Sequence, residues 1–277
     1  MKDPFLVHGP LKGPCSICGA QDSLTVDHVP PKGATRISTM EMRDLMDRLS
    51  VSGSKGHHEL SQNGVKFRSL CRICNNERLG AQCDPELIRL CNHADGVLRS
   101  RLILPATFAV DVRPMRVLRA LAGHLLATQS GRRPVGPFEE GLASFFLDLR
   151  LPPPRELECF YWIYPFNDQV IVRDAALTRL GHGIAPLVFK LIKFYPLAFL
   201  LTWKRHEANW RYQMPQLTRF RDLSNDEAVP MTIDLRVKLP QRWPEAPTGD
   251  GAVLYGGRPM HANPREFKSK KQLKKTK

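Results

Sequence analysis

The sequence predicts an α+β fold in two unequal parts, an N-terminal module and a larger domain with a mainly antiparallel sheet. Two observations carry this prediction. Two C-x-x-C pairs, "CSIC" at 15–18 and "CRIC" at 71–74, bracket a stretch with few long apolar runs. Farther along, residues 101–260 show two helical patterns followed by several strand patterns, an order typical of α+β domains. We therefore expect an N-terminal module over residues 1–100.

The length and composition are typical of a soluble globular protein. The chain has 277 residues, of which 42% are hydrophobic, enough for more than one core. The first residues lack the apolar run of a signal peptide. The most hydrophobic stretch, "FYPLAFLLTW" at 194–203, is only ten residues long and contains a proline. We expect a cytoplasmic protein without a membrane span.

The chain is basic, with a formal net charge of +14. Most of the excess follows residue 100, where 28 basic residues face 16 acidic ones. The end of the chain, "REFKSKKQLKKTK" at 265–277, has seven basic residues and one acid, which predicts a flexible basic tail over 261–277. Such charge favours a polyanionic partner, nucleic acid before membrane. A merely solubilising tail is the alternative.

Seven cysteines in a chain without a signal peptide argue against a disulfide framework, because cytosolic thiols stay reduced. Four of them form two C-x-x-C pairs, a spacing typical of metal sites. Each C-x-x-C pair presents two thiolates to one tetrahedral ion, and a redox role for the pairs is the alternative. The predicted ligands of a structural zinc ion are Cys15, Cys18, Cys71 and Cys74. The other three cysteines are expected to be small buried side chains: Cys83, Cys91 and Cys159.

Two strands are expected between the cysteine pairs. "SLTVDHV" at 23–29 alternates enough for a short strand. "VKFRSLC" at 65–71 alternates more clearly, with Phe67 on one face and Lys66 and Arg68 on the other. The first hundred residues therefore predict a small sheet that depends on the metal for much of its stability.

Helical patterns follow the second cysteine pair. "NNERLGAQ" at 75–82 is typical of a short helix or turn. "DPELIRLCNHADGVLRS" at 84–100 predicts a helix, with Asp84 as N-cap and Pro85 at the first helical position. The module is thus expected to run strand, strand, helix.

The segment between the two strands predicts an inserted surface helix over 38–50. There "STMEMRDLMDRLS" has a capping-box pattern, Ser38 with Glu41, and apolar residues at helical spacing. The loop after it contains His57 and His58, which we expect to be solvated rather than metal ligands.

The larger part of the chain, residues 101–260, shows helical periodicity first and strand patterns later. His124 lies within the apolar pattern of the first helix, which favours a core or boundary position over a ligand role. The expected helices cover 113–130 and 138–149. The expected strands cover 158–164, 168–174, 186–195, 197–203 and 231–239.

The joint pattern of the N-terminal module, C-x-x-C, then "DHVPP" at 27–31, then C-x-x-C-Asn, resembles the HNH endonucleases. It is most similar to the zinc-stabilised members that resemble phage endonuclease VII. The resemblance spans about residues 12–85 and implies a ββα-metal fold. It also implies a metal-dependent endonuclease that hydrolyses phosphodiester bonds in nucleic acid, and we expect this nucleic acid to be DNA.

The resemblance assigns roles to three residues. His28 corresponds to the general base, and Asp27 and Asn75 to ligands of a catalytic Mg²⁺ or Mn²⁺. The residue types suit the chemistry, since an imidazole accepts a proton from water near neutral pH and carboxylate and amide oxygens bind hard cations. Adjacent residues on a strand point to opposite faces, and Pro30 and Pro31 end the strand where the two side chains must diverge.

Three basic residues close in sequence to this set are candidates for phosphate binding: Lys32, Arg72 and Arg78. The family's middle asparagine has no counterpart in "VKFRSL", and Asn63 is the nearest residue of that type. A non-catalytic zinc-knuckle protein that binds DNA or RNA remains an alternative. So does a regulatory protein that binds a protein partner, or a second copy of itself, through the larger domain.

Overall fold

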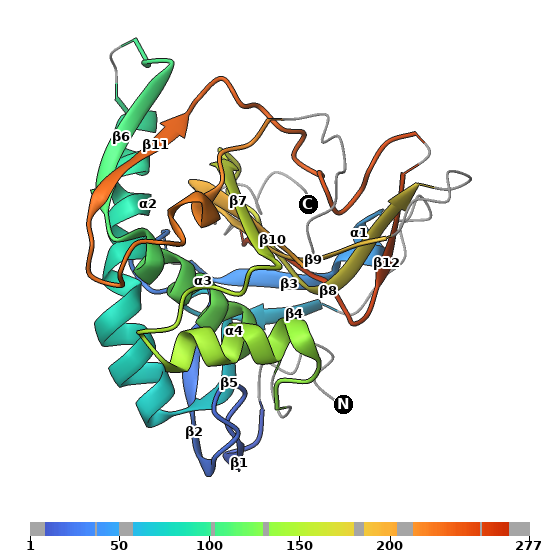
Figure 1. The fold of residues 1–277 in the computed structure, drawn as a ribbon. Helices are drawn as coiled ribbons and strands as arrows, with labels where there is room; N and C mark the ends of the chain where they lie inside the picture. Colours follow the sequence, from blue (N-terminus) through green and yellow to red (C-terminus); the bar gives the residue numbers. More distant parts are fainter. Residues whose placement is uncertain are drawn as a thin grey trace, which may run out of the picture.

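The computed structural model describes residues 9–36, 38–49, 58–100, 103–129, 133–179, 186–203, 213–249 and 251–265. Helices lie beside a large antiparallel sheet, and a three-stranded sheet and a two-stranded ribbon complete the fold (Figure 1). The expected combination of helices with a mainly antiparallel sheet is confirmed.

The N-terminal part contains the three-stranded sheet and the helix that follows it. The strands β1 (Lys12–Pro14), β2 (Gln21–His28) and β5 (Lys66–Cys71) pair antiparallel in the order β1-β2-β5. A wide, π-type helix, η1 (Ile73–Cys83), begins two residues after β5. Both predicted strands are confirmed, and the segment after Cys74, expected to be a short helix or a turn, is helical.

The helix α2 (Asp84–Leu98) continues directly from η1, so Asp84 does not start a separate helix. The N-cap position of α2 is Cys83, and the side chain of Asp84 contacts a histidine of another helix. The helix predicted over 84–100 is confirmed, but the N-cap role predicted for Asp84 is wrong. A cap is needed only where backbone N–H groups lack helical partners, and the preceding η1 supplies those partners here.

The helix predicted over 38–50 is wrong for its first half. Residues Met40–Asp44 form the strand β3, and only Leu45–Leu49 form a short helix, α1. The side chains of Met40 and Met42 are buried while that of Arg43 is exposed, which is the alternation of a strand. Pairing of β3 with a strand from the far end of the chain outweighs the local capping-box signal.

The large sheet is antiparallel at every pairing and has the order β4-β3-β13-β8-β9-β10-β7, with β12 also paired to β8. Four of its strands were expected from their apolar patterns, and those expectations are confirmed. The expected strands are β7 (Leu157–Ile163), β8 (Gln169–Arg179), β9 (Leu187–Phe194) and β10 (Leu197–Trp203). The sheet also contains β3, β4 (His58–Ser61), β12 (Gly251–Tyr255) and β13 (Met260–Pro264).

The large sheet combines strands from early in the chain, β3 and β4, with β13 from late in the chain. His58 is exposed at the start of β4, as expected of a solvated residue, while His57 lies outside the described residues.

Residues 261–264 belong to β13, which corrects the first part of the predicted tail. Met260 and Ala262 are buried where β13 pairs with β3 and β8, so these residues are core and not solvated chain. Residues 266–277 lie outside the described residues.

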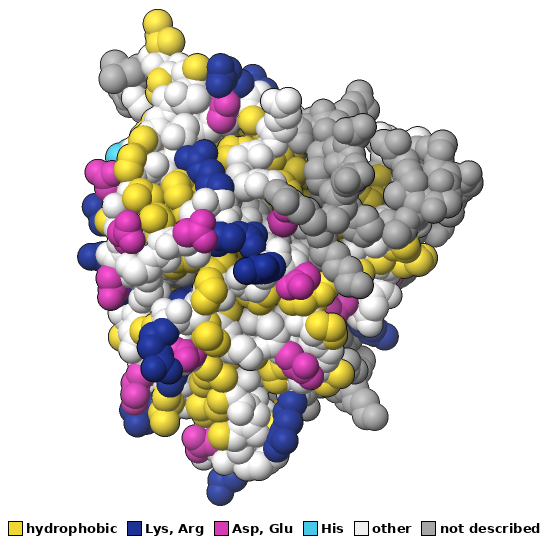
Figure 2. Space-filling view, in the orientation of Figure 1, with side chains coloured by type: hydrophobic (Ala, Val, Ile, Leu, Met, Phe, Trp, Pro, Cys, Tyr) yellow, Lys and Arg dark blue, Asp and Glu magenta, His cyan; other side chains and the backbone are white. Residues whose placement is uncertain are grey.

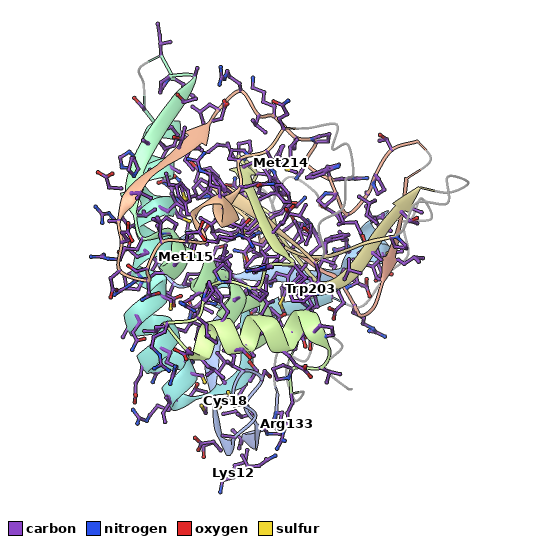
Figure 3. All side chains as sticks on the ribbon, viewed as in Figure 1. Lys12, Cys18, Met115, Arg133, Trp203 and Met214 are labelled. Atoms are coloured by element: carbon purple, nitrogen blue, oxygen red, sulfur yellow. The ribbon has the colours of Figure 1, made fainter. Side chains whose placement is uncertain are left out.

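The helices α3 (Pro114–Ala127) and α4 (Pro137–Leu147) lie between the three-stranded sheet and the large one (Figure 1). Both confirm predicted helices. Almost every residue of α3 is buried, and side chains fill the space around it (Figure 3). One core cluster includes residues from both sides of position 100, so the boundary expected there divides neither the core nor the large sheet.

The remaining elements lie beside this core. The strands β6 (Thr107–Val112) and β11 (Val229–Asp234) pair as a two-stranded ribbon, and β11 confirms the last predicted strand. A short 3₁₀ turn, η2 (Leu217–Phe220), precedes β11.

On the face shown in Figure 2, basic side chains are interspersed with acidic and apolar ones. None of the helices in the described part of the chain is both long enough and apolar enough to cross a membrane.

Close packing around α3 gives a testable prediction. A Cβ atom at Gly123 would lie 2.8 Å from Leu79 Cδ1 of η1 and 2.8 Å from Phe146 Cε2 of α4. Gly123→Ala is therefore expected to lower the free energy of unfolding by about 1–3 kcal/mol, because the core must move to make room. Urea denaturation measures the change.

The matched control is Gly96→Ala on the exposed side of α2, where an added Cβ meets nothing within 4 Å. This substitution is expected to raise stability by about 0.5–1 kcal/mol, because alanine is the better helix former. Equal stability gains at the two positions would contradict the packing described for α3.

Candidate functional site

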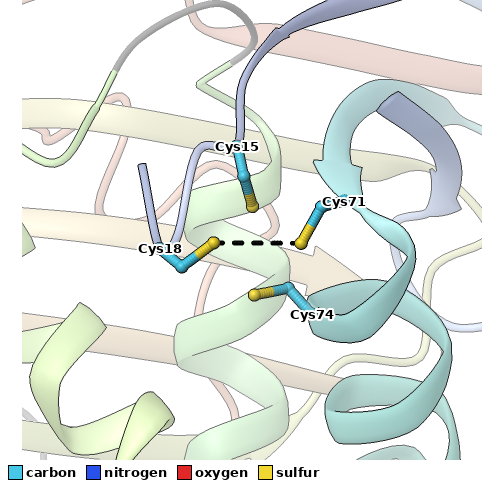
Figure 4. Close-up of side chains that lie close together, drawn as sticks. All are labelled: Cys15, Cys18, Cys71 and Cys74. Carbon is cyan, nitrogen blue, oxygen red and sulfur yellow. Dashed lines mark hydrogen bonds between the residues drawn. The ribbon is translucent and has the colours of Figure 1, made fainter. Parts of the chain in front are cut away.

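Four cysteine side chains converge beside the three-stranded sheet (Figure 4). Their sulfur atoms all lie within 4.8 Å of one another, and Cys18 Sγ is 3.8 Å from Cys71 Sγ. A tetrahedral ion with four Zn–S bonds of about 2.3 Å would hold its sulfur ligands about 3.8 Å apart. The cluster can therefore hold a metal ion such as zinc, and it contains all four residues expected: Cys15, Cys18, Cys71 and Cys74.

Backbone hydrogen bonds shape the first cysteine pair. The amide of Cys15 donates to the Ala20 carbonyl, and the amide of Gly19 donates to the Cys15 carbonyl, both at 2.9 Å. Gly19 closes this tight turn with a φ of 71°, a conformation that favours glycine. The amide of Ser16 donates to the Ser69 carbonyl of β5 at 2.9 Å. The turn is thus joined to the strand that ends at the second cysteine pair.

The thiols of the cluster affect one another's ionisation. A hydrogen bond from Cys74 lowers the pKa of Cys15 to about 4, and the same contact, with burial, raises the pKa of Cys74. Burial raises the pKa of Cys71 to about 11. Four neighbouring thiolates repel one another, and a bound divalent cation offsets that repulsion. The donor set therefore fits a metal ion.

The other three cysteines lie outside the cluster and are buried, as expected. Burial raises the pKa of all three thiols, which keeps them protonated and unreactive. They are Cys83, Cys91 and Cys159.

Asn75, the residue after the last cysteine of the cluster, is hydrogen bonded to β2. Its Nδ2 donates to Thr25 Oγ1 at 2.9 Å and to the Val26 carbonyl at 3.1 Å. Because both amide hydrogens have acceptors on β2, the amide oxygen is left to act as a ligand or acceptor elsewhere. The structure thus fixes Asn75 against the strand that contains Asp27 and His28.

Asp27 and His28 occupy opposite faces of the β2–β5 pair, as their alternation requires. Asp27 pairs with the buried Phe67 and has 5% of its surface exposed. His28 pairs with Lys66 and is half-buried. The strand β2 ends at His28, so the two side chains diverge at the end of the strand and before the prolines.

The surroundings of His28 keep its imidazole neutral at pH 7. Burial lowers its pKa below the usual 6.5. Asp27 raises this pKa, whereas Lys66 and Lys32 lower it, and a hydrogen bond to the Asn63 backbone raises it. Asn63 has a left-handed φ of 61° in the turn that precedes β5. A neutral imidazole in partial contact with solvent can accept a proton.

The inner face of β2 contains an interaction that the sequence did not reveal. His124 of α3 has its Nδ1 2.9 Å from Asp27 Oδ2 and its Nε2 2.9 Å from Asp84 Oδ1. The side chain of His124 is fully buried, which confirms its expected core position. Burial alone would lower its pKa, but the two carboxylates raise the pKa of His124 to about 10, so the ring is an imidazolium at neutral pH. Burial raises the pKa of Asp84.

These partners are distant in the sequence, 97 residues apart for Asp27 and His124 and 40 for Asp84 and His124. A titratable side chain within the otherwise apolar segment "ALAGHLLA" was the one local signal that His124 has buried polar partners.

The three basic candidates differ in their surroundings. Lys32 is exposed and close enough to His28 to affect its pKa. Arg72 is exposed and forms a 2.6 Å ion pair with Glu77. Arg78 instead donates to the Leu147 carbonyl at the end of α4, so its guanidinium connects two helices. Lys32 and Arg72 are therefore the accessible members of the set.

An open groove of about 250 Å³ lies between the first cysteine pair and α4. Cys18 and Arg133 lie near each other on its wall, at the end of the molecule formed by the β1–β2 hairpin (Figure 3). The side chain of Arg133 also approaches Gly19, whose added Cβ would lie 3.4 Å from Arg133 Cδ. The groove is lined by the cysteine turn and α4, and neither Asp27 nor His28 lines it.

The cysteine cluster predicts the metal content of the protein. Purified protein is expected to contain about one zinc ion per chain by plasma emission spectroscopy, and Cys71→Ser to contain far less, because three thiolates bind zinc less tightly than four. Removal of the metal by a chelator is expected to lower the melting temperature by about 10 °C or more.

Cys91→Ser is the control, since this buried thiol of α2 lies outside the cluster. It is expected to lower stability without lowering the zinc content. Full zinc content in Cys71→Ser would show that the cluster is not the zinc site.

A scan against family models finds no match for the chain, and searches of curated proteins and of solved structures find no similar chain.

Proposed function

We propose that the chain is a metal-dependent endonuclease of the HNH type that hydrolyses phosphodiester bonds in nucleic acid, and that this nucleic acid is DNA. One observation carries the proposal. Asn75, adjacent to the cysteine cluster, is hydrogen bonded to the Val26 carbonyl, directly before Asp27 and His28. Two of the three residues that the resemblance selects, Asp27 and His28, thus lie on a strand that Asn75 of η1 contacts directly.

The residues present fit a hard divalent cation. One oxygen of Asp27 is engaged by His124, which leaves the other for a metal. The amide hydrogens of Asn75 are both directed to β2, which leaves its oxygen. Oxygen ligands of this kind suit Mg²⁺ or Mn²⁺. A bound cation of this type would stabilise negative charge on the leaving oxygen of a cleaved phosphodiester.

His28 supplies the proposed base. Its ring is half-buried and its lowered pKa keeps it neutral at pH 7, so it can accept a proton from an attacking water. Lys66, opposite His28 on β5, and Lys32 place positive charge beside the ring. These lysines attract a phosphate backbone without reading its sequence.

One observation favours a second candidate function, a non-catalytic zinc-knuckle protein that binds nucleic acid. Only 5% of the surface of Asp27 is exposed, and one of its oxygens already faces the imidazolium of His124. In this second function Asp27 is a structural partner of α3, and the basic surface around His28 binds phosphates without cleaving them.

Plasmid cleavage distinguishes the two. Wild-type protein is expected to nick or linearise plasmid DNA with Mg²⁺ or Mn²⁺. His28→Ala is expected to lower the rate about 10²- to 10⁴-fold, because the base is lost. Asn75→Ala is expected to raise the concentration of metal needed, because one ligand is lost. His93→Ala, an exposed histidine of α2, is the control and is expected to cleave at the wild-type rate.

Cleavage by His28→Ala at the wild-type rate would rule out His28 as the base. DNA binding by the wild type without cleavage under any divalent ion would favour the second function.

The pH dependence of cleavage provides a separate prediction. The active form of His28 is neutral, and its pKa lies below 6.5, mainly through burial. The rate is therefore expected to be level between about pH 7 and 8 and to fall as the pH drops below about 6.5, where the ring becomes protonated. Initial rates measured across this range with saturating Mg²⁺ test it. A half-maximal rate above pH 7 would contradict the role given to His28.

A further inference from the structure

We propose that His124, held by Asp84, is a positioning residue that orients Asp27 toward the catalytic metal ion. This inference rests on the proposed function, in which Asp27 is a metal ligand. It assigns a task to two side chains, on α3 and α2, that lie outside the segment resembling HNH nucleases or at its edge.

The three side chains form a continuous hydrogen-bonded line. Asp27 of β2, His124 of α3 and Asp84 of α2 are joined by two contacts of 2.9 Å. Both nitrogens of the ring are engaged, so the ring cannot rotate without breaking both bonds. The side chain of His124 is fully buried, and water does not compete for these bonds. Because neither nitrogen is free, His124 is not itself suited to bind the metal.

The line fixes the direction of the second oxygen of Asp27. The bond from His124 Nδ1 holds Oδ2, and a carboxylate with one oxygen fixed presents the other in a restricted direction. Hydrogen bonds of this kind orient metal-binding carboxylates in many proteins, and their loss typically weakens metal binding about 10–100-fold.

Through Asp84, both proposed metal ligands, Asp27 and Asn75, are connected to one helical unit, the continuous helix formed by η1 and α2. Asp84 begins α2, which continues from η1, and η1 contains Asn75. Asn75 contacts β2 directly, and Asp27 is connected to the same helical unit through His124 and Asp84. The two oxygens proposed to bind the metal are thus fixed relative to each other.

A pair of substitutions separates positioning from general packing. The side-chain nitrogen of asparagine occupies the place of histidine Nδ1, whereas that of glutamine occupies the place of Nε2. His124→Asn therefore keeps the donor to Asp27, and His124→Gln keeps only the donor to Asp84. Both remove the imidazolium and leave one buried carboxylate without its donor, so a purely structural role would affect them alike.

The measurement is Mn²⁺ affinity by electron paramagnetic resonance, on zinc-loaded protein without nucleic acid. His124→Asn is expected to bind Mn²⁺ within about threefold of the wild type, and His124→Gln about 10–100-fold more weakly. Zinc content and circular dichroism establish that each variant is folded. If the His124 variants do not fold, Asp84→Asn and Asp84→Leu replace them. Asparagine keeps an acceptor for the ring and is expected to keep the affinity, whereas leucine removes it and is expected to weaken binding about tenfold.

Equal Mn²⁺ affinity in His124→Asn and His124→Gln, whether wild-type or equally weakened, would overturn the positioning role while leaving the proposed function intact. The same holds for equal affinity in the two Asp84 variants. Failure of the wild type to bind Mn²⁺ would instead overturn the metal assignment of Asp27, and the positioning role with it.

Discussion

The convergence of four cysteine sulfurs holds the turn after β1 against the end of β5 and the first turn of η1. These segments contribute buried side chains such as Ile17 and Leu70 to the core, and a cation held by the four sulfurs would add a direct link between them. Cys74 lies in the first turn of η1. Asn75 then lies against β2, within hydrogen-bonding distance of Thr25 and Val26. The arrangement of the candidate site follows from this one cluster.

The second constraint comes from α3, which connects the small sheet to the rest of the fold. Gly123 allows Leu79 and Phe146 to approach the helix closely. The side chain of the next residue, His124, is buried and meets two carboxylates. A buried imidazolium between two carboxylates is costly to dehydrate, but it fixes the register of three elements once formed. The helix thus connects the strand of the candidate site to the core of the larger part of the chain.

Local patterns predicted much of this structure because local physics decides it. Alternation in "VKFRSLC" and apolar periodicity in α3 and α4 correspond to the observed elements. The four cysteines were also found from spacing alone. The segment Met40–Asp44 was not, because its strand forms by pairing with Met260–Pro264, more than 200 residues away. The partners of His124 were missed for the same reason, since only the tertiary fold brings Asp27 and Asp84 to the ring.

The most direct test of the account is whether one protein molecule holds two different metals in two places. Crystals grown with zinc and manganese, measured at the absorption edges of both elements, locate each by its anomalous scattering. The account predicts a zinc peak among the four cysteine sulfurs and a separate manganese peak in contact with oxygens of Asp27 and Asn75. A zinc peak at the cysteines with no manganese at Asp27 would contradict it, and would leave Asp27 as a structural partner of His124.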